Sequence, residues 1–355
     1  MVNAKALAEE VRKAIRSVQG SGPVPLHRPF INSDDAEMVR HAAATEPVGY
    51  GYIEEFEEEL QLQTGSPHVI AVSSGTAALH LALLAVGVKP GDEVVVPPMT
   101  FAAAAAAVRY CGATPHFGSE ANGQAAQIKV HLLGRPNLSV NTAHLPTPVI
   151  EDAAAALGSR GRQGLMCGTM APIGILSFNN NKIVTTGGGG AVLTHSKTLA
   201  DEVRHLATTA RTQGSMVYRF DHDAVGYNYR MGNINAAMGL GQLLRLPAIL
   251  RAKRKLFEAY EAAFDGIDEV RLLQPDEGTR PNHWMNAIII NDRIAENTRD
   301  VIVETLLEDE IAARALFTPL HTLPPYKDFP SDHNAAMEAV ATFEETICIP
   351  SGSMS

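Results

Sequence analysis

The chain has 355 residues, 45% of them hydrophobic and 19% charged, and its 29 basic and 39 acidic residues give a formal net charge of -10 at pH 7. These proportions argue against extensive disorder and against a coiled coil, and the acidic balance lacks the basic footprint on which binding to duplex nucleic acid depends. Three cysteines without a CxxC pair, and apolar runs well short of the roughly 20 residues that span a bilayer, predict a cytoplasmic protein with reduced thiols and no membrane segment.

The first half of the chain changes from helical patterns to alternating strands and helices. Helices are predicted at residues 1–20, 34–44 and 52–65. Short apolar runs then predict strands at 68–74, 91–98, 113–117, 127–133 and 147–154, with helices at 75–88 and 100–112. Such alternation indicates a mainly parallel sheet covered by helices on both faces. Ligands of these sheets bind beyond the carboxyl ends of the strands.

The last third of the chain predicts a second, smaller unit. A long helical stretch at 235–264, bent near Pro247, leads to strands at 283–291 and 315–323 and a helix at 298–309. We place the domain boundary inside the long helix. The expected division is an N-terminal helical segment at 1–45 that packs on the small domain, a large domain at 46–240 and a small C-terminal domain at 241–355.

The first candidate site is the segment Ser73, Ser74, Gly75 and Thr76, which follows a strand and opens a helix. Hydroxyls and free backbone N–H groups at a helix N-terminus suit a phosphate group. Serine and threonine also begin helices simply as N-caps, so an ordinary cap is the alternative interpretation.

The second candidate is Asp152, at the end of the strand pattern in "VIEDAAAALG". A buried carboxylate needs a cationic or N–H partner to remain ionised, and the nitrogen of a pyridinium ring would serve. A helix cap or an internal salt bridge is the alternative.

The third candidate is Lys182, in "SFNNNKIVTTGGGG". The run Gly187 to Gly190 leads into a strand, whereas Walker and Rossmann loops open a helix, so a tight turn or a close backbone approach remains. Lys182 is expected at the same edge of the sheet as the phosphate-binding segment and the carboxylate of Asp152. There it could form a Schiff base with pyridoxal phosphate. A solvated surface lysine is the alternative. The histidines and cysteines show no metal-ligand spacing, so we expect no metal.

Four blocks of the chain, in order, resemble one known family: "SSGTAALHLALLAVGVKPGDEVVVPPMTFAAA", "VIEDAAAALGS", "SFNNNKIVTTGGGGAVLT" and "HDAVGYNYRMGNINAAMGLGQL". The chain is similar, from about residue 25 to 352, to the DegT/StrS family of pyridoxal-phosphate-dependent nucleotide-sugar aminotransferases. The resemblance implies the α/β type I fold of aspartate aminotransferase, with a large domain built on a mainly parallel mixed sheet flanked by helices and a smaller α/β C-terminal domain.

The resemblance also implies roles for individual residues. Lys182 would hold the pyridoxal 5'-phosphate cofactor and move a proton, and Asp152 would pair with its ring nitrogen. The other residues implied to bind the cofactor are Ser74, Gly75, Thr76, Phe101, Ser177 and Asn228, with Phe101 stacked on the ring. Asn228 would reach the phosphate of the neighbouring subunit, which implies a homodimer with shared active sites. Ala155 stands where the family usually has a polar residue near the ring.

The implied reaction is transfer of an amino group from L-glutamate to a nucleotide-linked keto-sugar, in surface polysaccharide or glycan biosynthesis. "TGGGG", the N-terminal helix and "NHWMNAIII" look most like the branch that aminates C4 of UDP-linked 4-keto-6-deoxy-N-acetylhexosamines. Tyr227 and His321 would lie near the substrate, although a structural histidine is an alternative for His321. Two other functions stay open: a sugar dehydratase of the same fold, whose members have histidine where this chain has Lys182, and a catalytically impaired regulator or scaffold.

Overall fold

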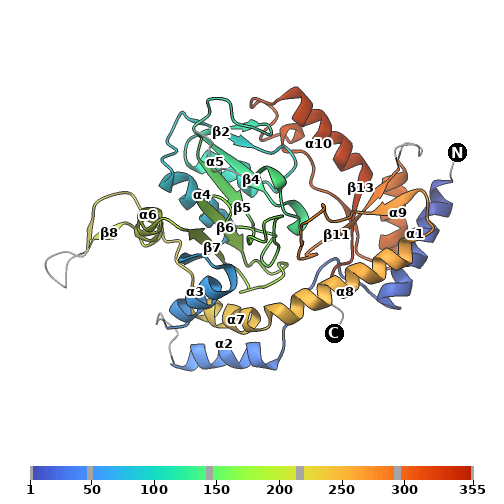
Figure 1. Ribbon diagram of the computed structural model, residues 1–355, viewed down its shortest axis with the longest axis horizontal. Helices are drawn as coiled ribbons and strands as arrows, with labels where there is room; N and C mark the ends of the chain where they lie inside the picture. The colour runs from blue at the N-terminus through green and yellow to red at the C-terminus, as the bar shows by residue number, and fades with distance from the viewer. Residues whose placement is uncertain (1–2, 46–50, 141–146, 213–219, 292–296, 353–355) are drawn as a thin grey trace.

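The computed structural model describes residues 3–45, 51–140, 147–212, 220–291 and 297–352. Its largest element is a seven-stranded sheet with the order β1-β7-β6-β5-β4-β2-β3 (Figure 1). All neighbouring strands from β6 to β3 are parallel, whereas β7 is antiparallel to both β1 and β6. The strands are β1 (His68–Val72), β2 (Glu93–Val96), β3 (Thr114–Phe117), β4 (Ala126–Val130), β5 (Val149–Asp152), β6 (Ile173–Ser177) and β7 (Gly190–Thr194). The predicted mainly parallel sheet is therefore confirmed.

Helices cover both faces of this sheet, because successive side chains of each strand point to opposite faces. On one face, Ile70 and Ile175 join a core with α4 (Gly75–Ala85), α5 (Ala103–Tyr110) and α6 (Lys197–Ala207). On the other, Ala71 and Leu176 pack with α3 (Gly51–Thr64) and α7 (Asn233–Leu244). α5 begins within a run of six alanines at 102–107 and buries Ala104, Ala105 and Ala107, so small side chains bring this helix close to the sheet.

The long helical stretch is broken in two, as the proline predicted. α7 ends at Leu244 and α8 (Leu246–Phe264) begins beside Pro247, which occupies a first-turn position where its missing N–H costs nothing. In Figure 1, α8 runs from beneath the large sheet to the smaller unit. It therefore links the two sheets.

The smaller unit contains a four-stranded antiparallel sheet with the order β10-β11-β13-β12. Its elements are β10 (Val270–Leu272), β11 (Asn286–Ile290), α9 (Thr298–Glu308), β12 (Arg314–Ala315), the short 3-10 helix η3 (Leu320–Thr322), α10 (His333–Glu345) and β13 (Thr346–Ile349). The predicted strand at 283–291 and the predicted helix at 298–309 are confirmed. The predicted strand at 315–323 is wrong beyond Ala315, because Pro319 lacks the N–H that a ladder requires and the chain forms η3 directly after it.

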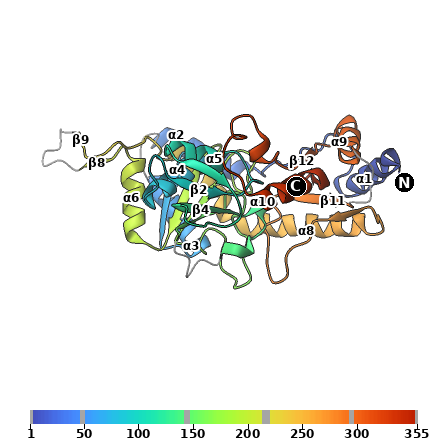
Figure 2. The same ribbon diagram turned by 90° about the horizontal axis from the view of Figure 1, so that it is seen from above.

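The two N-terminal helices pack in different places. α1 (Ala4–Gln19), whose N-terminus is capped by Asn3, buries Leu7, Val11 and Ile15 in one core with α8, α9 and the small sheet. α2 (Ser33–Thr45) lies against α7 instead, and Figure 2 shows α1 and α2 far apart. The division of the chain at residues 45 and 240 stays a prediction.

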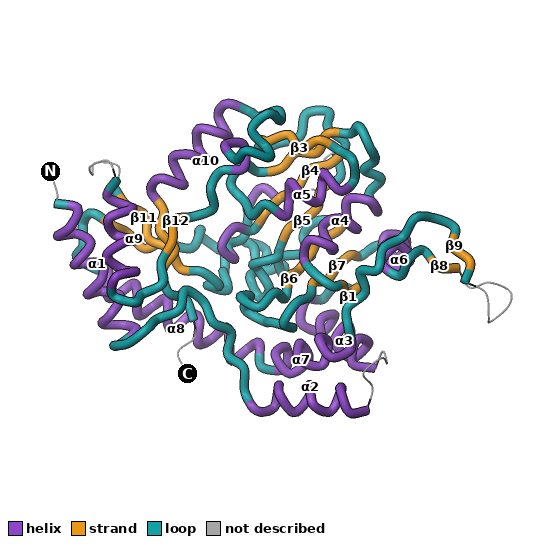
Figure 3. The backbone as a smooth tube through the Cα atoms, turned by 180° about the vertical axis from the view of Figure 1, so that it is seen from behind, coloured by secondary structure: helices purple, strands orange, loops and turns teal. Residues whose placement is uncertain are grey.

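Further short elements complete the described chain: the 3-10 helices η1 (Leu132–Gly134) and η2 (Leu138–Val140), and the strand pair β8 (Arg211–Thr212) and β9 (Asp221–His222). In Figure 3 the β8–β9 arm extends away from the rest of the molecule. In the part of the chain described, no helix is both long and apolar enough to cross a membrane.

Candidate active site

A cavity of about 540 Å³ lies beyond the carboxyl ends of β4, β5 and β6. Its lining includes the end of each of these strands and the first turn of α4. It also includes the turn at 179–182, called the Lys182 turn below, and Arg314 of the small sheet. Of the residues expected at the site, it contains Ser74, Gly75, Thr76, Phe101, Asp152, Ser177 and Lys182. Residues separated by more than 100 positions in the sequence thus meet at one rim of the sheet, as the parallel topology predicts.

The first turn of α4 offers donors to an anion. Ser74 is the N-cap, and its hydroxyl accepts a hydrogen bond from the backbone N–H of Ala77 at 3.0 Å. Ser74 therefore acts as an ordinary N-cap through its hydroxyl oxygen. The hydroxyl hydrogen is still able to donate to a phosphate. Because Ala77 is used by the cap, the N–H groups of Gly75 and Thr76 remain at the positive end of the helix dipole.

The glycines around this turn permit close backbone packing. A Cβ on Gly190 would lie 2.5 Å from the carbonyl carbon and oxygen of Ser74, and a Cβ on Gly75 would lie 2.8 Å from Cβ of Ser177. In contrast, no atom lies within 4 Å of a Cβ on Gly188, which lines the cavity. The expected close backbone approach is confirmed at Gly190, and Gly187, with φ of 77°, provides the tight turn.

Lys182 and Asp152 influence each other's charge across the cavity. Burial lowers the pKa of Lys182 to about 8, with the positive Arg314 acting in the same direction and Asp152 opposing it. Burial raises the pKa of Asp152, and the N–H of Ala154, which donates to Oδ1 at 3.0 Å, lowers it together with the charge of Lys182. Because the pKa of Lys182 is about 8, its amine can both accept and release a proton at physiological pH, as a group that transfers protons must.

Trp284, from the turn before β11, packs directly on the lysine. Nζ of Lys182 lies 4.3 Å from the centroid of the Trp284 ring, and the indole N–H donates to the backbone oxygen of Asn181 at 2.7 Å. Buried Lys253 of α8 donates to the backbone oxygen of Trp284 at 3.2 Å and to that of Ser351. A chain of contacts therefore connects α8 to the position of the Lys182 amine.

The small sheet supplies a further wall that the sequence interpretation missed. Arg314 of β12 lines the cavity with its guanidinium carbon 4.8 Å from the Phe317 ring centroid, and Phe317 lies 5.8 Å from the Phe101 ring. Phe101 is 62% exposed, so its ring face is available to a ligand. No local periodicity joins residues 314 and 317 to residue 101, so the sequence carried no signal for this wall.

Three expected residues do not line the cavity. Tyr227 stacks on Tyr229, with 5.1 Å between ring centroids, and packs edge-on against His80 at 4.8 Å. Asn228 is exposed, and His321 lies in η3 with Nδ1 buried and without a hydrogen-bond partner in the described chain. Their expected roles stay predictions.

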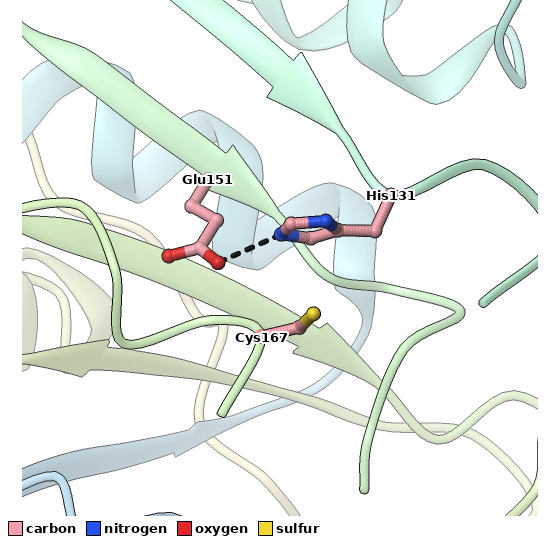
Figure 4. Close-up of side chains that lie close together, drawn as sticks. All are labelled: His131, Glu151 and Cys167. Carbon is pink, nitrogen blue, oxygen red and sulfur yellow. Dashed lines mark hydrogen bonds and ion pairs between the residues drawn. The ribbon is translucent and has the colours of Figure 1, made fainter. Parts of the chain in front are cut away.

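A buried cluster beside Asp152 was also missed. Nε2 of His131 donates to Oε1 of Glu151 at 2.7 Å. Figure 4 shows this pair with Cys167 close by. Glu151 accepts three more hydrogen bonds, from the backbone N–H groups of Gly168, Met170 and Ala171. The N–H of Asn137 donates to Nδ1 of His131 at 2.8 Å.

These hydrogen bonds occupy both nitrogens of His131, and burial raises the pKa of Cys167 and keeps the thiol protonated. The atoms of His131, Glu151 and Cys167 that could ligate a metal ion lie within 4.8 Å of one another. As arranged, His131 and Glu151 form a hydrogen-bond network with the surrounding backbone, and the Cys167 thiol lies beside it. The network fixes the strand end that carries Asp152 and holds the His131 ring in the cavity wall.

A lysine with a lowered pKa, a buried carboxylate and a helix N-terminus around one cavity are groups suited to hold pyridoxal phosphate, as in type I aminotransferases. The model of the DegT/DnrJ/EryC1/StrS aminotransferase family matches residues 29–135 and 122–354, and this chain belongs to that family.

Relatives agree with this assignment. The chain is 34% identical over 336 residues to GDP-perosamine synthase of Escherichia coli O157:H7, covering 88% of this chain and 90% of the relative. It superimposes on the aminotransferase TlmJ from Streptoalloteichus hindustanus with a TM-score of 0.84 and 27% identity over 93% of both chains. The PLP form of Spr1654 from Streptococcus pneumoniae gives a TM-score of 0.83 at 25% identity, covering 93% of this chain and 94% of that one.

The cofactor is pyridoxal 5'-phosphate, and the cavity fits it: two first-turn N–H groups and Ser177 suit the phosphate, Asp152 the ring nitrogen and Lys182 the aldehyde. When bound, the cofactor supplies an electron sink for the carbanion formed at the amino donor. The protein is thus a pyridoxal-phosphate-dependent aminotransferase of the DegT/DnrJ/EryC1/StrS family.

Proposed function

We propose that this enzyme transfers the amino group of L-glutamate to C4 of a nucleotide-linked 4-keto-6-deoxy-sugar. The observation that carries the proposal is the amine of Lys182, with a pKa of about 8, in one cavity with buried Asp152. An amine that is partly neutral at physiological pH can take a proton from one carbon and return it to another. The curated relative named above makes an amino sugar linked to a nucleotide, which supports the sugar substrate.

In this proposal each residue has one task. Lys182 holds the cofactor and moves the proton, and Asp152 stabilises the proton on the ring nitrogen. Gly75, Thr76 and Ser177, with the O–H of Ser74, hold the phosphate, and Phe101 covers the ring. The guanidinium of Arg314 adds positive charge to a cavity that must receive anionic substrates.

The proposal includes a homodimer whose active sites are shared. Asn228 is exposed and follows the β8–β9 arm, so it is available to the cofactor phosphate of a second subunit. Tyr227 and His321 would approach the sugar nucleotide only in that assembly, because neither lines the cavity of one chain. Sedimentation of the wild type and of Asn228→Ala, with cofactor affinity measured for both, tests this arrangement.

Two nucleotides are candidates. The branch resemblance favours a UDP-linked 4-keto-6-deoxy-N-acetylhexosamine, whereas the name of the 34% identical relative favours a GDP-linked sugar. Steady-state kinetics with both keto-sugar nucleotides decides between them by the ratio of kcat/KM. Absence of turnover with both keto-sugar nucleotides would overturn the proposed sugar class.

The test of the reaction type is an absorption spectrum of the protein loaded with pyridoxal phosphate, for the wild type and for Lys182→Ala. The visible band of the bound cofactor is expected only with Lys182, and L-glutamate is expected to shift it to shorter wavelength. A spectrum that does not depend on Lys182 would favour a regulator or scaffold. Loss of a hydroxyl from the sugar without amination would favour the dehydratase.

A further inference from the structure

A second cavity, of about 480 Å³, lies between α8, the turn at 158–160 and the segment 274–283. Adjacent residues connect it to the active site: His283 lines the second cavity and Trp284 the first. The volume lies within the range of about 300–1,000 Å³ that ligand sites usually occupy.

One wall of this cavity is a single face of α8. Its residues recur every three or four positions, which places them on one side of a helix: Leu250, Arg251, Arg254, Phe257, Glu258 and Glu261. Gly158 allows the opposite wall to approach, because a Cβ there would lie 2.8 Å from both terminal methyl carbons of Leu250. The cavity is therefore formed by close packing of two segments far apart in the chain.

The opposite wall places two arginines side by side. The N–H of Arg160 donates to the backbone oxygen of Arg280 at 2.8 Å, and the N–H of Arg280 donates back at 2.9 Å. Residues that exchange both bonds in an antiparallel bridge project their side chains to the same side. Like charges placed directly opposite each other are destabilising, so this pair favours a neighbouring anion.

The balance of charge around the cavity is positive. Four arginines and two glutamates line it, a difference of +2 in a chain whose net charge is -10. Glu258 pairs with Arg254 at 2.9 Å, whereas Arg251 and Arg280 make no ion pair within the described ranges. Burial, together with the charge of Arg254, lowers the pKa of His283 to about 4, so its ring adds no charge of its own at neutral pH.

We propose that this second cavity is a binding site for a diphosphate-bearing anion. The planar guanidinium group donates two parallel hydrogen bonds to phosphate oxygens, and Arg160, Arg251 and Arg280 surround the space from both walls. The ring of His283 stacks on Phe257 with 4.3 Å between centroids, which fixes a polar ring nitrogen in the wall. The diphosphate belongs either to free pyrophosphate or to a nucleoside diphosphate.

Binding at the second cavity does not depend on the proposed reaction, and a tryptophan next to the cavity can be used to follow it. Trp284 is the single tryptophan of the chain, follows His283 directly and contacts Lys182. Its fluorescence is therefore expected to change when the neighbouring residue His283 meets a ligand in the second cavity, without any turnover of substrate.

The experiment titrates the pyridoxal-phosphate-loaded enzyme with inorganic pyrophosphate at low ionic strength and follows tryptophan fluorescence, with calorimetry to count sites. The wild type is compared with the double variant Arg251→Ala/Arg280→Ala and with Arg271→Ala, an exposed arginine of β10 outside the cavity. We expect one site whose dissociation constant rises at least about tenfold in the double variant and is unchanged in Arg271→Ala, as loss of two charge-assisted contacts predicts.

A parallel titration of the wild type and the double variant with GDP and UDP distinguishes the two sources: nucleotide binding that is tighter than pyrophosphate binding and weakened in the double variant assigns the second cavity to a nucleotide, whereas nucleotide binding that the double variant retains belongs to the active site and leaves the second cavity to the free anion. Circular dichroism and the cofactor spectrum show whether the variants are folded, and Arg251→Lys/Arg280→Lys, which keeps the charge but loses the paired guanidinium donors, is expected to bind more weakly than the wild type and more tightly than the double alanine variant. Pyrophosphate binding that is absent, or equal in wild type and double variant, overturns the proposal. A change in sedimentation alone would assign these arginines to a protein contact and overturn it equally.

Discussion

At the scale of single residues, the site depends on two ionisable groups that are both removed from water. Burial disfavours the charged form of each, so the pKa of Lys182 falls and that of Asp152 rises, while their mutual attraction opposes both shifts. The net result for Lys182 is a pKa of about 8. The ring of Trp284, 4.3 Å from Nζ, favours the protonated amine.

This predicts how Lys182 of the cofactor-free protein reacts with an amine-specific reagent. The neutral amine is the nucleophile, so labelling should rise with a midpoint near pH 8, against about 10.4 for an ordinary lysine. Mass spectrometry of the peptide with Lys182 measures it, and the exposed Lys255 is the internal reference. In Asp152→Asn the midpoint should move to lower pH, because the negative charge that stabilises the protonated amine of Lys182 is lost. A midpoint near that of ordinary lysines would contradict the described burial.

A second prediction concerns Asp152 itself. Asp152→Asn keeps the size of the side chain but cannot hold a proton on the ring nitrogen by charge. We expect kcat to fall about 10²-fold or more, the usual effect of removing a group that assists proton transfer. Single-turnover kinetics with L-glutamate measures the first half-reaction alone. An unchanged rate would remove Asp152 from the proposed machinery.

At the scale of elements, strand ends, turns and caps position the site, and much of this was predictable. The glycines before a strand predicted a tight turn or a close backbone approach at 187–190, and the serine before a helix predicted a cap or a phosphate site, but only the structure shows that the turn packs on the N-terminus of α4. The wall formed by Trp284 and Arg314 was not predictable, because its position depends on how the small sheet docks. The buried pair His131 and Glu151 was missed because neither spacing nor periodicity links Glu151 of β5 with a residue that follows the end of the neighbouring strand β4.

The glycine turn gives a matched pair of variants. A Cβ at Gly190 would lie 2.5 Å from backbone atoms of Ser74, so Gly190→Ala should lower the free energy of unfolding by about 1–3 kcal/mol through overpacking. It should also weaken cofactor binding, because the start of α4 must move. Gly188→Ala meets no atom within 4 Å and should change stability by less than about 0.5 kcal/mol. Urea denaturation of both cofactor-free variants measures the difference, and equal stability would refute the close approach.

At the scale of the whole molecule, the two sheets are connected beneath the active site. α8 carries Lys253, which holds Trp284 and Ser351, and the N-terminal segment places His27 beside Trp284 with 6.2 Å between ring centroids. Burial, with the charge of Lys253, lowers the pKa of His27 to about 2. A neutral histidine thus lies where the small unit, the N-terminal segment and the Lys182 turn meet.

This arrangement predicts a loss of stability in mild acid. In the unfolded chain a histidine takes up a proton near pH 6.5, whereas folded His27 stays neutral down to about pH 2, so protons favour the unfolded state between these values. When the pH is lowered from 7 to 5.5, protonation of residue 27 in the unfolded chain should lower the free energy of unfolding by about 1 kcal/mol. Urea titrations at both pH values, for the wild type, His27→Phe and the exposed-site control His195→Phe, measure this cost. His27→Phe should reduce the difference between the two pH values by that amount and His195→Phe should not, while an equal acid response in all three proteins would show that His27 is protonated in the folded state.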